Sequence, residues 1–194
     1  MNELFCLDQF DPRQIIGTLS AQGAMSVPLL REDFRLTLLE EARSSTYATE
    51  PDVIGSGEEE VHQQVSSRCV IGEGSAYALL RQAFHTVCEE AFSSLAPYPF
   101  TTPLRLMELR LQKYAPGSSG ITAHRDGSCF CNLVCVFLIG GSGRFVVCAD
   151  RSGRDARDLD ATPGRLLLLR APGFLGSEER PFHYLTEIGE ERYT

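Results

Sequence analysis

The chain has 194 residues, 43% of them hydrophobic and 23% charged, which is enough for one sizeable core and predicts a single domain spanning 1–194. The formal net charge of −8 and the pI near 5.0 argue against a broad nucleic-acid-binding surface. The longest strongly apolar stretch, 133–139, is far shorter than the roughly 20 residues that cross a bilayer. Because the N-terminus also lacks a basic leader and an apolar core, we expect a cytoplasmic protein without a membrane segment.

Seven cysteines in a chain with no export signal favour reduced thiols over a disulfide framework. Cys129, Cys131 and Cys135 are spaced so that they would share one face of a strand. No CxxC pair accompanies them, and free cysteine behaves as a small buried hydrophobic residue. We therefore expect these thiols to pack in the core rather than to serve a zinc or redox site.

The first part of the chain, 1–103, carries helical signals. Apolar residues mix with charges in 32–42, and they recur at steps of three and four residues in 75–92, which predicts two amphipathic helices. Between them, 47–60 is rich in Glu, Gly and Ser and has little periodicity, which predicts a mobile surface loop. Prolines at 97, 99 and 103 then end the helical pattern.

The remainder of the chain, 104–194, changes to short apolar or alternating runs broken by Gly and Pro, which is typical of antiparallel sheets. This pattern predicts a small β-sandwich with the helices of 1–103 packed on one of its sheets, an α+β fold. The predicted strands are 104–114, 121–124, 130–139, 144–148, 165–170, 182–188 and 192–194.

A histidine and a carboxylate, His124 and Asp126, stand two positions apart in a predicted strand, so both side chains face the same way and can bind one metal ion. Of the other histidines, His62 falls in a polar segment and His85 in a predicted helix, which leaves His183 as the third ligand. Two histidines and one carboxylate on one face form the facial triad of non-haem Fe(II) oxygenases, with coordination positions left open for other molecules. The residue between the first two ligands, Arg125, is expected to point away from the metal.

Arg192 follows His183 by nine residues, and a guanidinium there can hold the far end of a dicarboxylate in a bidentate salt bridge. With His124-x-Asp126 and the interval to His183, this pattern resembles the 2-oxoglutarate and Fe(II)-dependent dioxygenases. The resemblance covers roughly 105–194 and includes the glycine-rich turn at 140–145 and the proline-glycine turn into an apolar strand at 162–169.

The resemblance implies a double-stranded β-helix core, also called a jelly-roll or cupin-like fold. It implies Fe(II) held by His124, Asp126 and His183, 2-oxoglutarate as co-substrate with its C5 carboxylate on Arg192, and O2 as oxidant. A carboxylate at position 126 favours hydroxylation or demethylation, because halogenating relatives have a small residue there.

The segment 111–117 resembles the one that precedes HxD in the AlkB branch of this superfamily, where a polar side chain and a tyrosine contact the co-substrate. The resemblance carries these two roles to Gln112 and Tyr114. Two features of that branch are missing from the sequence as given: a second arginine several residues after Arg192, and an identifiable nucleotide-recognition segment in 1–103.

Three further polar residues are candidates for substrate contact. Arg110 shares a face with Gln112 and Tyr114, and Arg170 ends an apolar strand where it either reaches solvent or binds an anionic substrate. Asn132 is the one polar residue of an apolar run, and it either bonds the backbone or faces the site.

These observations favour a hydroxylase acting on a small molecule or a peptide side chain. An AlkB-like nucleic-acid demethylase is the second hypothesis, disfavoured by the acidic charge. The third is a β-sandwich binding module without catalysis, which would bind no iron.

Overall fold

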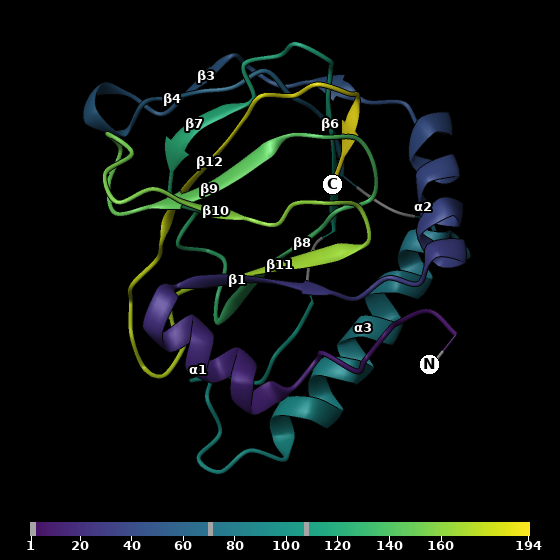
Figure 1. The fold of residues 1–194 in the computed structure, drawn as a ribbon, viewed down its shortest axis with the longest axis vertical. Helices are drawn as coiled ribbons and strands as arrows, with labels where there is room; N and C mark the ends of the chain where they lie inside the picture. The colour runs from purple at the N-terminus through teal and green to yellow at the C-terminus, as the bar shows by residue number, and fades with distance from the viewer. Residues whose placement is uncertain (1–2, 70–71, 107–108) are drawn as a thin grey trace.

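The computed structural model describes residues 3–69, 72–106 and 109–194 as a mixed helix and strand fold with several antiparallel sheets (Figure 1). The helices are α1 (Pro12–Gln22), α2 (Glu32–Ser44) and α3 (Ala76–Ser93), with a 3-10 turn at Gly57–Glu59. The strands are β1 (Ala24–Pro28), β2 (Ala48–Thr49), β3 (Val53–Ile54), β4 (Val61–His62), β5 (Ser66–Cys69), β6 (Arg110–Tyr114), β7 (Ile121–His124), β8 (Leu133–Phe137), β9 (Arg144–Cys148), β10 (Arg157–Leu159), β11 (Arg165–Arg170), β12 (Phe182–Thr186) and β13 (Arg192–Tyr193).

Local chemistry explains where the helices begin and end. The Asp11 carboxylate accepts hydrogen bonds from the backbone N–H groups of Arg13 and Gln14, and Pro12 occupies the first turn of α1. This helix ends at Gly23, whose φ of 75° is the left-handed conformation that glycine adopts without strain. Ser75 caps α3 by accepting a hydrogen bond from the Ala78 N–H.

Two sheets frame the interior of the molecule. One has the strand order β1-β11-β8, and the other has the order β10-β9-β12-β7. A third sheet, β13-β6-β5-β2, is connected to the segment after β8 by a bridge between Gly140 and Tyr193. Arg157 of β10 joins the first two sheets at one edge, since its Nη2 donates to the carbonyl of Ala24 at 3.0 Å.

Strand β11 is buried on both faces, which explains its uninterrupted leucine run. Leu166 and Leu168 pack into a cluster formed with the helices, whereas Leu167 and Leu169 pack into a second cluster between the sheets. Figure 1 shows α1 and α3 on one side of β1 and β11, with β9, β10 and β12 on the other side. The helices therefore cover one face of this sheet, and the opposite face lines the interior.

The prediction of two amphipathic helices is confirmed by α2 and α3. Every predicted strand segment after Pro103 contains a strand, although the first begins only at Arg110, and its positions 107–108 lie outside the described residues. The structure adds α1 and β10, and it places β1 to β5 in the part predicted to be helical. Of these, β1 pairs along the whole of its length with β11, so 1–103 contributes strands to shared sheets as well as helices.

The prediction that all three cysteines pack in the core is wrong for Cys129 and Cys131, which are exposed. They precede β8, and Asn132 between them and this strand has a φ of 69°, which interrupts the extended conformation. Cys135, in β8, is partly buried against the helix-side cluster as predicted.

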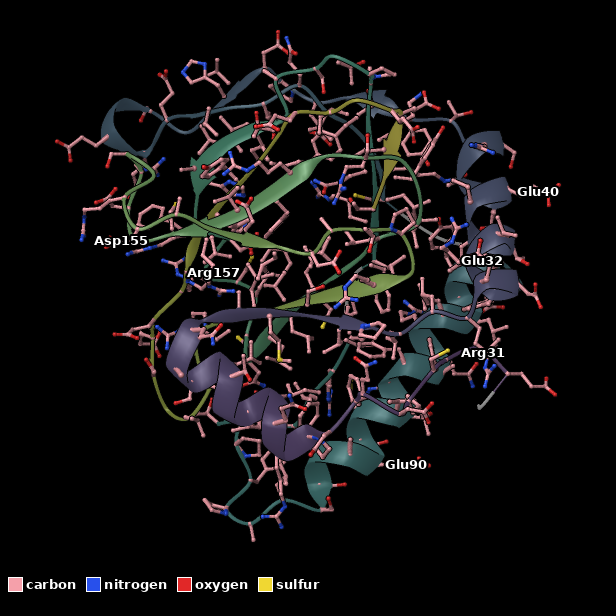
Figure 2. The ribbon with its side chains drawn as sticks, in the orientation of Figure 1. Arg31, Glu32, Glu40, Glu90, Asp155 and Arg157 are labelled. Atoms are coloured by element: carbon pink, nitrogen blue, oxygen red, sulfur yellow. The ribbon has the colours of Figure 1, made fainter. Side chains whose placement is uncertain are left out.

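The helices carry charge on their outer faces. Figure 2 shows Glu40 of α2 and Glu90 of α3 projecting outward from the body of the molecule. Within the ranges that the structure describes, no helix combines the length and apolar character needed to span a membrane.

Candidate metal centre and co-substrate site

The structure brings His124, Asp126 and His183 together, with ligand atoms that all lie within 4.8 Å of one another. His124 ends β7 and is the register partner of His183 on β12, so the two rings project from adjacent strands on one face. Their centroids are 4.3 Å apart, and His183 Nε2 lies 3.7 Å from Asp126 Oδ2. The grouping provides two imidazoles and one carboxylate that together could hold a single metal ion.

Hydrogen bonding prepares His124 for metal coordination. Its Nδ1 lies 2.9 Å from the backbone carbonyl of Thr122, a contact in which the ring nitrogen is the donor. Because Nδ1 then carries the proton, Nε2 is left with a free lone pair for a metal.

The environment of His183 keeps its imidazole neutral. Burial lowers its pKa from 6.5 to about 4, and the nearby Asp126 carboxylate opposes this shift only in part. The ring of Phe145 stacks on it at 5.4 Å between centroids and 16° between planes. A neutral, oriented imidazole is the form that binds a metal.

Arg192 is a buried cation, and the described residues place no carboxylate against it. Its side chain is 1% exposed, and its one hydrogen bond runs from Nη1 to the carbonyl of Ala161 at 3.5 Å. Among the described residues, Nε and Nη2 have no hydrogen-bond partner. Burial lowers its pKa to about 10, so the group stays charged at neutral pH. An unpaired buried guanidinium is costly, and a bound carboxylate would compensate it.

Tyr114 and Gln112 of β6 lie on the same face of the sheet as Arg192 of the neighbouring strand β13. Tyr114 stands directly opposite Arg192 in the register of β6 and β13, and its hydroxyl donates to Gln112 Oε1 at 3.4 Å. Burial raises the pKa of Tyr114 to about 12, so the hydroxyl remains a hydrogen-bond donor. Together with Arg192 these groups present donors suited to a dicarboxylate such as 2-oxoglutarate.

The three candidates for substrate contact each interact with other residues of the protein. Arg110 is exposed and lies 3.9 Å from Glu50, and Arg170 forms an ion pair with Glu179 at 2.6 Å. The Asn132 amide donates to the carbonyl and hydroxyl of Thr102, so this residue ties two loops together. The backbone-bonding alternative for Asn132 is therefore the one that the geometry supports.

Sequence reasoning missed two residues that support the ligands. Phe145 stacks on His183, and Arg180 donates from Nη1 to the backbone carbonyl of Asp126 at 2.5 Å. The sequence predicted a strand at 144–148, but neither the contact of Phe145 nor that of Arg180 follows from spacing.

Comparison of the sequence with family models and with curated proteins finds no match. Solved structures do match. A prolyl-4-hydroxylase from Pseudomonas putida is 16% identical, with 94% of this chain and 95% of that chain covered and a TM-score of 0.67. A Trichoplax adhaerens prolyl hydroxylase, solved with a peptide of hypoxia inducible factor, is 14% identical over 95% of this chain and 88% of that chain, with a TM-score of 0.68.

A third match is an oxidoreductase of the 2OG-Fe(II) oxygenase family from Burkholderia pseudomallei, 13% identical over 94% of this chain and 87% of that chain, with a TM-score of 0.60. This chain has a 2-oxoglutarate and Fe(II)-dependent oxygenase fold. The superfamily resemblance inferred from the HxD pattern agrees with this fold. At this level of identity the likeness concerns the fold, so the chemistry has to be argued from the residues of the site.

Proposed function

We propose that this protein is an Fe(II)- and 2-oxoglutarate-dependent dioxygenase that hydroxylates a small molecule or a peptide side chain. The observation that carries the proposal is the pairing of two features in one interior. His124, Asp126 and His183 offer a facial set of metal ligands, and no anion pairs with the buried guanidinium of Arg192 in the part of the chain that the structure describes. A β-sandwich binding module would have no reason to keep such a cation buried.

The sheet arrangement supports a jelly-roll core in a single domain, 1–194. The sheet β1-β11-β8 continues through the Gly140–Tyr193 bridge to β13 and β6, and it faces the sheet β10-β9-β12-β7 across the inner cluster. Two facing antiparallel sheets with a ligand site between them are the architecture of that fold.

Each residue has a role that follows from its chemistry. His124, Asp126 and His183 would hold Fe(II) from one side, with Asp126 supplying one negative charge. Arg192 would pair with the C5 carboxylate of 2-oxoglutarate, while the Tyr114 hydroxyl and the Gln112 amide orient the co-substrate. When bound, iron with 2-oxoglutarate and O2 supplies an oxidative decarboxylation to succinate and CO2 that is coupled to hydroxylation of a C–H bond.

The apolar residues around the site would exclude water from it. Val147 is the register partner of His183, and Phe145 covers the face of its ring. Burial of these side chains beside the ligands lowers the local dielectric, which strengthens the interaction of Arg192 with a carboxylate.

The substrate class proposed is a peptide or a small molecule. Two solved structures with this fold are prolyl hydroxylases, one of them in complex with a peptide, so prolyl peptides are the first substrates to screen. The net charge of −8 disfavours the alternative of nucleic-acid demethylation.

The proposal is tested by adding Fe(II) and 2-oxoglutarate to the protein without oxygen. We expect a weak visible charge-transfer band that is lost in His183→Ala and kept in His85→Ala, a control on α3 outside the ligand set. Succinate release in air, screened over amino acids, prolyl peptides and methylated nucleobases, then identifies the substrate class. Absence of the band with the intact protein would overturn the proposal.

A further inference from the structure

The backbone that carries Asp126 is not held by a strand ladder. β7 is the edge strand of its sheet, and it ends at His124. The register with β12 runs only from the pair His124–His183 to the pair Ile121–Leu185. Asp126 therefore lies beyond the last paired residue, and its position needs another restraint.

Arg180 provides a contact at this position. Its Nη1 donates to the Asp126 carbonyl at 2.5 Å, and the contact is partly buried. Arg180 precedes His183 by three residues and lies in the segment that enters β12. A charged donor on a carbonyl forms one of the stronger hydrogen bonds. This hydrogen bond joins the segments that carry Asp126 and His183, two proposed metal ligands that are far apart in the sequence.

The neighbouring charged residues are engaged elsewhere, so they do not duplicate this contact. Glu179 pairs with Arg170 at 2.6 Å, and Arg125 stacks with its Cζ 4.1 Å from the Phe182 ring centroid. Arg151 donates from Nη1 to the carbonyls of Glu60 and Ala123, at 3.2 and 3.3 Å. Among the described residues, Arg180 is the side chain that bonds the Asp126 backbone.

We propose that Arg180 is a positioning residue of the metal centre. It fixes the loop after β7 so that the Asp126 carboxylate lies against His183, at 3.7 Å between Oδ2 and Nε2. This inference rests on the proposed function, because it assumes that the three residues bind a metal. It assigns to Arg180 no contact with substrate or co-substrate.

The test is a Co(II) titration followed by the visible spectrum of the bound ion, which reports the coordination geometry. Arg180→Gln removes the charged donor, and we expect it to weaken Co(II) affinity by about 10- to 100-fold, the usual effect of losing a group that orients a ligand. The bound Co(II) spectrum should change as well. Arg180→Lys keeps a charged donor and should recover part of the affinity.

Arg154→Gln is the charge-matched control. Arg154 is exposed and pairs with Asp150 and Asp155, so this variant loses the same charge away from the ligands, and its Co(II) affinity should equal that of wild type. The melting temperature of each metal-free variant separates positioning from general stability.

Affinity of Arg180→Gln within about threefold of wild type would overturn the inference, as would a lower melting temperature with unchanged Co(II) affinity. If Arg180→Gln does not fold, Arg180→Lys is the deciding variant. Co(II) affinity below that of wild type with a changed spectrum supports the inference, whereas wild-type affinity with an unaltered spectrum overturns it. Failure of wild-type protein to bind Co(II) more tightly than His183→Ala would instead overturn the proposed function.

Discussion

The two faces of strand β11 look onto cores of different character. On the helix side, Leu166 and Leu168 meet a cluster of edge-to-face aromatic rings, in which Phe84 contacts Phe5, Phe10 and Phe137. The buried hydroxyl in this cluster, that of Tyr77, donates to the carbonyl of Leu38. Between the sheets, aliphatic residues surround Tyr114, His183 and Arg192, and the guanidinium of Arg192 has two nitrogens without partners.

The difference suggests that the two cores contribute differently to stability and to ligand binding. On the helix side the buried Tyr77 hydroxyl is satisfied by a carbonyl of the protein, so that core contributes to the free energy of unfolding. The inter-sheet core keeps a charged group, Arg192, with two nitrogens unpartnered among the described residues, which lowers stability in the free protein. Three substitutions and a change of pH test this difference between the two cores.

Truncation in the helix-side core should give the largest change in stability. Phe84 is fully buried, and Phe84→Ala should lower the free energy of unfolding by about 3–5 kcal/mol, since the cavity would not be filled. Urea denaturation of the metal-free protein measures this loss. The Co(II) affinity of the folded fraction should not change. A weaker Co(II) affinity would show that the two cores are coupled.

Lowering the pH should reduce the stability of the metal-free protein through His183, which lies in the inter-sheet core. The pKa of His183 falls from 6.5 to about 4 on folding, so between these values the unfolded chain takes up a proton that the folded protein does not. Stability of the metal-free protein should therefore fall by roughly 3 kcal/mol as the pH drops through this window. Urea denaturation at several pH values tests this. In His183→Leu this component should be missing, and an equal pH dependence in both proteins would contradict the assignment.

Arg192→Met should separate binding from stability. Removing the buried cation should weaken 2-oxoglutarate binding on the order of 100-fold, because hydrogen bonds to charged groups contribute about 1.5–3 kcal/mol. The free energy of unfolding of the ligand-free protein should rise, by about 1 kcal/mol or more, since no charge remains buried. Calorimetric titration and urea denaturation measure the two effects. A loss of stability with unchanged binding would mean that Arg192 is structural.

The smallest effect is expected for Tyr114→Phe. This variant removes one neutral hydroxyl, which donates to Gln112 in the free protein and would turn to a carboxylate oxygen of bound 2-oxoglutarate, so 2-oxoglutarate affinity should fall about five- to tenfold, for a single hydrogen bond of about 1 kcal/mol. Titration with 2-oxoglutarate in the presence of Co(II) checks this. Unchanged affinity would remove Tyr114 from the co-substrate site and leave it as a core residue.

Much of the site could be predicted because short-range geometry encodes it. His124 and Asp126 share a direction by their spacing in extended chain, and elimination among four histidines left His183. The structure groups all three, although Asp126 lies just beyond the end of β7. The helices α2 and α3 and most strands after Pro103 could also be predicted, since their periodicity is a local property of the sequence.

Other features depend on contacts between distant segments, which no local pattern records. β1 has an unremarkable sequence and becomes a strand because β11 offers it an antiparallel partner along Ala24–Pro28. Cys129 and Cys131 were predicted to be buried from an apolar run, but the turn at Asn132 leaves them exposed. Arg170 ends a leucine run and Arg180 follows two glutamates, and neither context indicates that the first pairs with Glu179 and the second donates to the Asp126 carbonyl.

From the sequence came the candidate ligands His124, Asp126 and His183, the arginine after the distal histidine, the helices α2 and α3, and the strand segments after Pro103 except β10. The folded structure adds that Arg192 is buried with Nε and Nη2 unpartnered among the described residues, that Arg180 donates to the Asp126 carbonyl, and that the two faces of β11 pack into different clusters. The physical reason is that burial and pairing are properties of the folded chain. They arise from residues that are far apart in sequence and meet only when the sheets close.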